Sequence, residues 1–349
     1  MAWVSGLQQS GVIAALGAAL LFGAGTPLAK LLLDGVSPWL LAGLLYLGAG
    51  IGLALYRVLS RRPSVALHRA EAGWLFGAVA AGGVIGPVLL MFGLAGMPAS
   101  GASLLLNAEG VFTALLAWFA FRENFDRRIA IGMFLIMAGA VVLSWSGEAG
   151  FGDVWPALCI LGACFMWAID NNLTRKVSLT DATWIASLKG LAAGSVNLVL
   201  AFALGAHWPS LPQTLAAMLV GLLAYGVSLA LFVVSLRHLG TARAAAYFSV
   251  APFFGAVLAL LLGEPFSLPL GIAGILMTLG VWLHLTEHHE HEHIHQAMSH
   301  DHEHIHDTHH QHDHAFDWDG TEPHRHPHRH APMLHAHPHF PDMHHRHPH

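Results

Sequence analysis

The sequence predicts an all-helical integral membrane protein of ten transmembrane helices, built as two inverted five-helix repeats and followed by a disordered tail. Of the 349 residues, 55% are hydrophobic and only 11% are charged. A soluble domain carries roughly 25% charged residues, so this chain has too few to cover a soluble surface. Two further observations support the prediction: ten long apolar runs, and a regular alternation of basic loops.

Each apolar run is close to the roughly 20 residues that a helix needs to cross a bilayer. Pro, Gly and charged residues separate the runs, as expected at turns. A helical bundle is expected because lipid leaves no exposed backbone group solvated. The predicted helices lie near 10–33, 37–59, 72–95, 99–121, 128–147, 153–174, 181–204, 212–236, 241–263 and 268–287.

The distribution of the Lys and Arg residues over the loops tests the predicted number of ten helices. If the N-terminus is cytoplasmic, every cytoplasmic loop holds basic residues and no outer loop does, which is the positive-inside pattern. An even number of helices then places the C-terminal tail in the cytoplasm as well. The basic loop residues are Arg57, Arg61, Arg62, Arg69, Arg122, Arg127, Arg128, Arg175, Lys176, Arg237 and Arg243.

An internal repeat divides the chain into segments 10–147 and 153–287, offset by roughly 141–145 residues. In this register Trp39 falls on Trp184, and the turn at Glu123 falls on the turn at Glu264. A repeat with five helices must insert its second copy upside down. Inverted repeats of this kind are typical of transporters, with the substrate bound near the bilayer midplane between the halves.

These features resemble the EamA repeat of the drug/metabolite transporter superfamily. The resemblance rests on an Arg/Gly-Glu-x-Phe turn after the fourth helix and a Gly-rich fifth helix, and it covers residues 10–287. The first copy departs from the pattern at Gly110-Val111 and at Arg122. The resemblance implies a secondary transporter or exporter of small metabolites in the bacterial inner (plasma) membrane.

Glu109 and Lys189 are the strongest candidates for function, because charges inside a bilayer are rare and costly. Each occurs once, since the repeat counterparts are Val250 and Leu44. They are expected to line or gate the cavity between the halves, and protonation of Glu109 offers a means of coupling transport to a proton gradient. The alternative is a structural Glu109–Lys189 ion pair without substrate contact.

Further candidates for contact with the substrate are polar or aromatic residues at presumed mid-depth. Ordinary packing is the alternative for each. They are Asn107, Tyr46, Trp167, Tyr225 and Tyr247. The polar residues 170–172 are expected to be interfacial and paired with the basic loop. Lys30 is expected to reach outward as an anchor, and Glu123 and Glu264 to cap helices or pair with loops.

The tail, residues 288–349, contains 24 of the 28 histidines, many in His-x-His runs. It cannot bury an apolar core and is expected to be disordered. Imidazole binds Zn²⁺, Ni²⁺, Co²⁺ and Cu²⁺, so metal binding by the tail is predicted. A physiological metal buffer, a pH-sensitive segment and tolerated low-complexity sequence all remain open. The predicted ligands are His291, His293, His295, His300, His302, His304, His306, His324, His326, His328 and His330.

The sequence contains no Walker A loop, no Gly-x-Ser-x-Gly and no His-Glu-x-x-His, so an enzyme is not expected and no cofactor is required. Nucleic-acid binding is not expected either, because the basic residues follow the membrane topology. Expected partners are the lipid bilayer and a small-molecule substrate, with no prediction of oligomeric state. Metabolite export is the leading hypothesis. A transition-metal transporter and a membrane-anchored metal sensor or buffer are the alternatives.

Overall fold

A computed structural model shows two compact units, Met1–Thr286 and Glu287–His349. We describe each unit separately. The residues that the structure describes are 2–62, 69–121, 127–144, 154–174, 181–239, 244, 247–285, 290–295, 298–304, 324–330 and 333–338.

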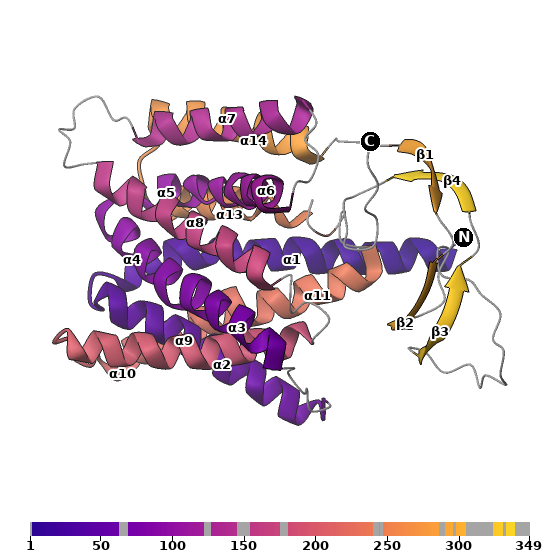
Figure 1. The fold of residues 1–349 in the computed structure, drawn as a ribbon. Coiled ribbons are helices and arrows are strands. Elements are labelled where there is room, and N and C mark those ends of the chain that lie inside the picture. The colour runs from indigo at the N-terminus through magenta and orange to yellow at the C-terminus, as the bar shows by residue number, and fades with distance from the viewer. Residues whose placement is uncertain are drawn as a thin grey trace. The chain divides into compact units, whose positions relative to one another are not determined.

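In the first unit, helices joined by turns make up the described residues (Figure 1). Two π-helical segments, η1 (Val79–Ile85) and η4 (Leu222–Val227), connect α-helices end to end. The α-helices are α1 (Ala2–Leu32), α2 (Pro38–Leu59), α3 (Arg69–Ala78), α4 (Gly86–Gly96), α5 (Ala99–Leu105), α6 (Ala108–Phe121), α7 (Arg127–Ser144), α8 (Trp155–Thr174), α9 (Ala182–Ala203), α10 (Leu211–Gly221), α11 (Ser228–Leu239), α13 (Ala251–Leu261) and α14 (Leu268–Leu285).

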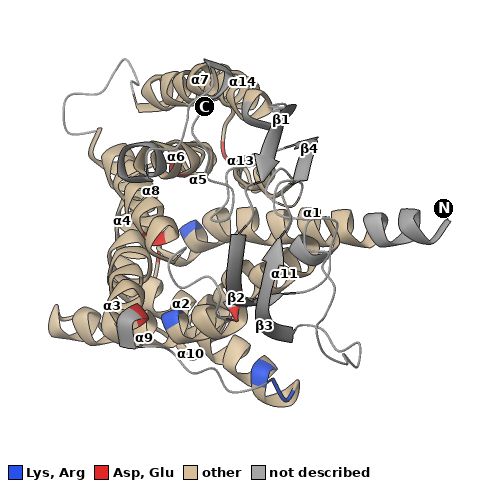
Figure 2. Cartoon of the chain, turned by 45° about the vertical axis from the view of Figure 1, so that its right-hand side comes forward, with Lys and Arg blue, Asp and Glu red and all other residues tan. Residues whose placement is uncertain are grey.

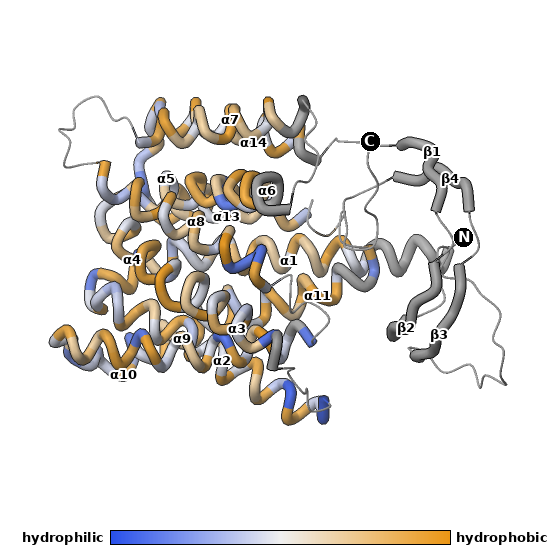
Figure 3. The backbone as a smooth tube through the Cα atoms, viewed as in Figure 1, coloured by the Kyte–Doolittle hydropathy of each residue, from blue (hydrophilic) through white to orange (hydrophobic). Residues whose placement is uncertain are grey.

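Among the described residues, seven helices are long and apolar enough to cross a membrane. Three shorter apolar helices, Ala130–Ser144, Ala251–Leu261 and Leu268–Leu283, fall on the predicted fifth, ninth and tenth spans. Apolar residues dominate the helices along their length (Figure 3), and large ones such as Phe76 and Leu261 are exposed on the outside. The all-helical membrane fold is confirmed, while the count of ten spans stays a prediction.

The third helix of each predicted repeat contains a π-helical segment. The η1 segment joins α3 to α4, and η4 joins α10 to α11. Their first residues, Val79 and Leu222, lie 222 − 79 = 143 positions apart, within the repeat offset expected from the sequence. The two halves therefore share an irregularity that general helix propensity would not produce twice at matched positions.

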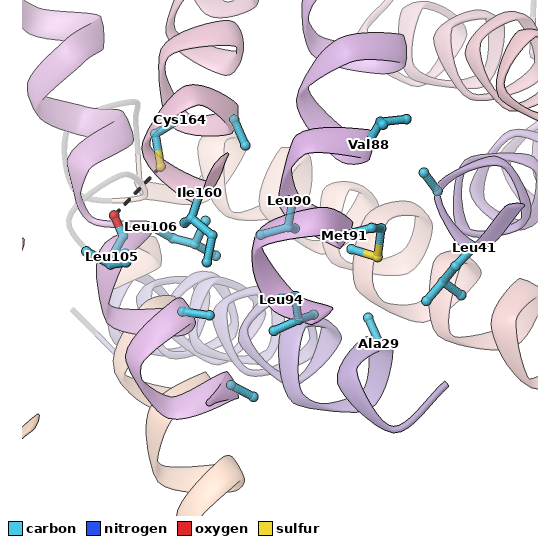
Figure 4. Close-up of a cluster of buried hydrophobic side chains, with 14 of the residues drawn as sticks. Ala29, Leu41, Val88, Leu90, Met91, Leu94, Leu105, Leu106, Ile160 and Cys164 are labelled. Atoms are coloured by element: carbon cyan, nitrogen blue, oxygen red, sulfur yellow. Dashed lines mark hydrogen bonds between the residues drawn. The ribbon is translucent and has the colours of Figure 1, made fainter. Parts of the chain in front are cut away.

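The fourth helix of each predicted repeat is discontinuous. A turn at Leu106-Asn107 separates α5 from α6, and a turn at 249–250 precedes α13. A break exposes carbonyl groups that lipid cannot solvate. The Asn107 amide donates to the Leu104 carbonyl at 2.9 Å, and the Cys164 thiol contacts the Leu105 carbonyl at 3.7 Å (Figure 4).

The apolar core surrounds this break. Side chains from α2, α4, α5 and α8 fill it, and Figure 4 shows Leu41, Met91, Leu94 and Ile160 among them. Each of these four is at most 1% exposed. A break that is held by buried, well-packed neighbours is fixed in position rather than free to unwind.

Helices α2 and α9, which are counterparts in the two predicted repeats, cross at glycines. Gly50 lies against Gly190, and Gly43 lies against Gly194. Residue numbers rise along one helix as they fall along the other, so the helices run antiparallel. A Cβ atom added at Gly190 would lie 2.7 Å from the Gly50 Cα atom, which explains the need for glycine.

Helices α7 and α14 are another pair of counterparts. They also pack closely at glycines and lie side by side in Figure 1. A Cβ atom at Gly139 would lie 3.2 Å from the Ala273 carbonyl oxygen, and one at Gly280 would lie 2.6 Å from that of Gly132. Both glycines and their partners are 141 positions apart (280 − 139 and 273 − 132). The antiparallel, reciprocal contact is what inverted repeats require.

Charged side chains secure helix ends, as expected for Glu264. Its carboxylate accepts hydrogen bonds from the backbone N–H groups of Ala99 at 2.6 Å and Ser100 at 2.9 Å, at the start of α5. Lys30 donates to the carbonyls of Leu94 at 2.7 Å and Ala95 at 3.2 Å, near the end of α4. Both interactions follow the helix dipole. Glu123 lies outside the described residues.

A second link joins the end of α2 to the start of α9. Arg57 donates to Asp181 at 2.7 Å and to the Thr183 hydroxyl at 2.8 Å. Asp181 also caps α9 by accepting from the backbone N–H groups of Thr183 and Trp184. Burial raises the pKa of Asp181, but the hydrogen bonds from Thr183 and Arg57 outweigh burial and lower this pKa to about 2.

The described residues of the second unit form four strands in two antiparallel pairs. Strand β1 (Glu290–His295) pairs with β4 (Met333–Pro338), and β2 (Met298–His304) pairs with β3 (His324–His330). The prediction of a disordered tail is not confirmed in these ranges. It rested on the lack of an apolar core, whereas the His-x-His alternation matches the two-residue period of a strand. His306 lies outside the described residues.

The glycine crossing predicts a sharp contrast between two Gly→Ala substitutions. In Gly50→Ala the new methyl group meets the backbone nitrogen of Leu191 at 2.5 Å, so we expect a loss of about 1–3 kcal/mol from overpacking. Gly73→Ala is the control, because nothing lies within 4 Å of its Cβ position. Thermal unfolding in detergent measures both. Equal stability of the two variants would contradict the close crossing.

The Asp181 link predicts a stability difference that depends on pH. Asp181→Asn keeps the cap acceptor but loses the charge facing Arg57, while Asp181→Ala loses both and costs about 1 kcal/mol from the cap alone. The folded pKa of about 2 lies below the ordinary 3.8, so the carboxylate stabilises the fold above about pH 4. This advantage over Asp181→Asn declines as the pH falls towards 2, and melting curves at several pH values measure it. A constant difference across that range would exclude the ion pair as its source.

Candidate functional site

The most buried ion pair among the described residues joins α8 to α9. The Lys189 ammonium donates to both oxygens of Asp170, at 2.6 and 2.5 Å, and these side chains are 16% and 10% exposed. The Thr174 hydroxyl donates to the same carboxylate at 2.8 Å. The alternative of a Glu109–Lys189 ion pair is therefore not observed, since Lys189 pairs with Asp170. The expectation of an interfacial Asp170 is corrected, because Asp170 is buried.

Glu109 lies at the helix break, as the second residue of α6. Its carboxylate accepts a hydrogen bond from the Asn171 amide at 2.9 Å, and the same amide reaches the Thr113 hydroxyl at 3.3 Å. The first backbone N–H groups of a helix carry a partial positive charge, which favours a carboxylate there. Within the part of the chain that the structure describes, the partner of Glu109 is therefore a neutral amide and not a cation.

The π-helical segment η1 brings two of the four predicted aromatic residues together. The Tyr46 hydroxyl donates to the Gly82 carbonyl at 2.7 Å, and the Trp167 indole N–H donates to the same oxygen at 2.9 Å. Asp170 packs directly on Gly82, so any side chain at that position would overlap the carboxylate. Gly82 is the point where α2, α8 and the ion pair meet.

The next carbonyl along η1 is also used. The Asn197 amide of α9 donates to the Gly83 carbonyl at 3.2 Å, and Asn197 is fully buried. Its side-chain oxygen has no hydrogen-bond partner among the described residues. An unpaired buried acceptor at a polar site is where a water molecule or a ligand donor is expected.

The remaining sequence candidates occupy different places. Tyr225 packs against Tyr46, with ring centroids 5.7 Å apart, so it lies beside the site. Asn107 is buried at the helix break, and its amide donates a hydrogen bond to the Leu104 carbonyl. Tyr247 is 38% exposed. The structure thus gathers Tyr46, Trp167 and Lys189 around Asp170, and leaves Tyr247 apart.

Sequence reasoning missed the central role of Asp170. The signal was available, because the repeat register that places Lys189 on Leu44 also places Asp170 on Gly25. A charge whose counterpart carries no side chain meets the same criterion that selected Glu109. Its position close to the basic end of its helix instead favours an interfacial residue. Asn197 and Gly82 gave no comparable signal.

Charged residues are sparse in the helices, and Figure 2 shows them as isolated positions in a mostly uncharged bundle. The helical part that the structure describes holds no group of three or more His, Cys, Asp or Glu residues suited to a metal ion. What the site offers is one carboxylate at a helix break, one ion pair and several aromatic and amide groups. This set suits a small polar molecule better than a metal ion.

Relatives confirm the resemblance. An "Uncharacterized transporter" of Methanothermobacter thermautotrophicus is 32% identical over 295 residues, which cover 78% of this chain and 85% of the relative. A "Probable amino-acid metabolite efflux pump" of Salmonella typhimurium is 35% identical over 83 residues, covering 24% and 28% of the two chains.

The fold itself has a match among solved structures. A chain described as "Crystal structure of protein" aligns with a TM-score of 0.61 at 18% identity, covering 79% of this chain and 95% of that one. The profile of the EamA-like transporter family matches twice, at residues 9–145 and 154–286. The two matches span most of the sequence and leave out the tail. This chain belongs to the EamA-like transporter family.

Proposed function

We propose that this protein is a secondary transporter that exports a small polar or amphipathic metabolite across the bacterial inner membrane. The observation that carries the proposal is that adjacent residues of α8 bind two charged groups. Asn171 donates to Glu109 at the break in the fourth helix, and Asp170 pairs with Lys189. Charged groups at such depth are costly, and they persist in membrane proteins mainly where they serve a substrate or ion path. The Salmonella relative named as an efflux pump supports the direction.

The site offers partners of both signs to a substrate. The carboxylates of Glu109 and Asp170 suit an amino group of the substrate. Lys189 and the first backbone N–H groups of α6 suit a carboxylate or phosphate of the substrate. Tyr46 and Trp167 supply apolar surface with a polar edge. A zwitterionic metabolite of about amino-acid size satisfies all of these groups together.

Glu109 is the proposed coupling residue. Its partner in the described structure is the neutral Asn171, so it can gain or lose a proton without leaving a cation unpaired. The Lys189–Asp170 pair, by contrast, would lose its attraction on protonation. Coupling to a proton gradient therefore rests on Glu109.

The membrane arrangement belongs to the same proposal. It has ten spans, in halves 10–147 and 153–287, with both termini in the cytoplasm. The inverted halves are supported by the antiparallel crossings of α2 with α9 and of α7 with α14. Exchange of shape between two similar halves gives alternating access at small energetic cost.

Transition-metal transport is the second candidate, and the histidine-rich tail favours it. A metal path needs ligands inside the bilayer as well. The described helices hold no cluster of metal-ligating side chains, so metabolite export takes precedence.

Replacement of Glu109 by Gln should abolish proton-driven transport and leave folding intact. Gln keeps an oxygen that accepts from Asn171 and removes the titratable proton. We expect at least about a tenfold loss of substrate accumulation in proteoliposomes under a pH gradient, since proton-coupled steps contribute about that much or more. A screen of amino acids supplies the substrate.

The matched control for this experiment is Glu71→Gln, which removes a carboxylate at the start of α3, outside the site. Melting temperatures of both variants report folding. Wild-type accumulation by the Glu109→Gln protein would remove Glu109 from the mechanism and leave it a structural residue.

Single and double substitutions of the ion pair separate a structural role from a role in transport. Asp170→Asn or Lys189→Met alone leaves a buried charge unpaired, and we expect each to cost about 3–5 kcal/mol of stability. The double variant removes both charges and should recover most of that loss. Thermal unfolding measures the recovery.

Transport by the recovered double variant is the decisive measurement. If the pair contacts the substrate, the double variant folds but transports at least about tenfold more slowly, by the loss of a charge-assisted bond. Full transport by a folded double variant would show that the pair only holds α8 to α9.

A further inference from the structure

The hydroxyl of Ser103, in α5, is buried without a hydrogen-bond partner among the described residues. Its oxygen exposes less than 1 Å². Other buried serines find a carbonyl, since Ser187 donates to Gly50 at 3.2 Å and Ser228 donates to Ala18 of α1 at 2.8 Å. A buried polar group that is left unpaired costs free energy, so the state of Ser103 needs an explanation.

The carbonyl of Gly23, in α1, lacks the usual donor of a helix. The residue four positions later is Pro27, which lies inside α1 and has no backbone N–H group. Lipid supplies no replacement, and in transmembrane helices a Ser or Thr side chain can take this role. A hydroxyl group is therefore expected close to the Gly23 carbonyl.

Gly255 of α13 is the point where these two groups meet, because α13 packs against both α1 and α5. A Cβ atom added at Gly255 would lie 2.7 Å from the Gly23 carbonyl oxygen and 2.7 Å from the Ser103 hydroxyl oxygen. The two oxygens are thus no more than twice that distance apart, yet no hydrogen bond joins them. A shift of less than about 3 Å would bring them to the distance of a hydroxyl hydrogen bond.

A bound water does not explain the unpaired hydroxyl in this state. A buried water needs space of its own and several polar partners, whereas protein atoms cover the Ser103 oxygen almost completely. The hydroxyl does not bond back to its own helix either, as Thr278 does to the Gly274 carbonyl at 2.6 Å. The missing partner therefore has to come from a movement of the protein.

We propose that the Ser103 hydroxyl and the Gly23 carbonyl form a conformational switch, open in the arrangement that the structure shows and bonded in a second one. Helices α1 and α5 belong to the first half, and α13 belongs to the second. In the open arrangement Gly255 packs against both oxygens. When the second half shifts, α1 and α5 close on each other and Ser103 donates to Gly23. The inference rests on the proposed transport function, since alternating access supplies the two arrangements.

The test measures the populations of the two arrangements and needs no substrate. Spin labels are placed at Leu31→Cys in α1 and Leu261→Cys in α13, which are 56% and 78% exposed and lie near the ends of their helices. The native Cys159 and Cys164 are buried and are replaced by Ser. Electron paramagnetic resonance then gives the label distances in the full-length protein, at pH values where both arrangements are populated.

We expect Ser103→Ala to shift the population ratio about fivefold towards the open arrangement, the effect of one ordinary hydrogen bond. In a Pro27→Ala background the helix regains its own donor to Gly23, so Ser103→Ala should then have little effect. The matched control is Ser235→Ala, which removes a buried hydroxyl that bonds within α11, to the Phe232 carbonyl at 2.8 Å. This control should leave the ratio unchanged.

An equal shift by Ser103→Ala in the Pro27 and Pro27→Ala backgrounds would overturn the proposal, because the hydroxyl would then act elsewhere than on Gly23. A single label distance at every pH would overturn it as well. Two arrangements with the expected dependence on Pro27, in a protein that transports no amino acid, would contradict the proposed export and support the switch.

Discussion

The bilayer offers no hydrogen bonds to the protein backbone, and the architecture of the helical unit depends on how this constraint is met where helices are irregular. A regular α-helix pairs each interior carbonyl with a backbone N–H group, whereas the change into a π segment or a break in a helix interrupts this pattern. In the described residues, side chains of other helices donate hydrogen bonds to backbone carbonyls at these positions. Tyr46, Trp167 and Asn197 donate to carbonyls of η1, and the Cys164 thiol contacts the Leu105 carbonyl at the end of α5. Polar side chains are thereby drawn to the irregular positions, which is why the candidate site forms there.

The two halves agree in backbone and differ in chemistry. The π segments, the discontinuous fourth helices and the reciprocal glycine contacts of α7 with α14 all recur at the repeat offset. The charged residues do not recur, since Glu109, Asp170 and Lys189 face Val250, Gly25 and Leu44 in the alignment. The shared features describe how the bundle is held together. The residues that occur once are not needed for the shared fold, because the other half forms without them, and they are the residues to which we assign the substrate in the proposed function.

Structural features that depend on residues close together in the sequence could be predicted, whereas contacts between side chains of different helices could not. The lengths of the apolar runs predicted where helices lie, and the position of Glu264 at a helix end predicted a cap. The Lys189–Asp170 pair was not predicted, because it depends on a packing contact that no linear pattern reports, namely that Gly82 leaves room for the Asp170 carboxylate. In the tail, composition suggested disorder, while the alternation of histidine, visible in the same residues, agrees with the observed strands.

A polar contact within one half can persist when the two halves move against each other, whereas a contact that joins the halves cannot. Asp170 and Lys189 both belong to the second half, so their bond survives any motion of one half against the other. The Glu109–Asn171 bond joins α6 of the first half to α8 of the second, and the Trp167–Gly82 bond also crosses between them. A rearrangement that opens the bundle must break these crossing bonds, and the first of them involves a group that can change its charge. Protonation removes the negative charge to which the Asn171 amide donates and weakens that bond. The carboxylate at the helix break is thus placed where a proton alters the contact between the halves, while the ion pair beside it stays intact.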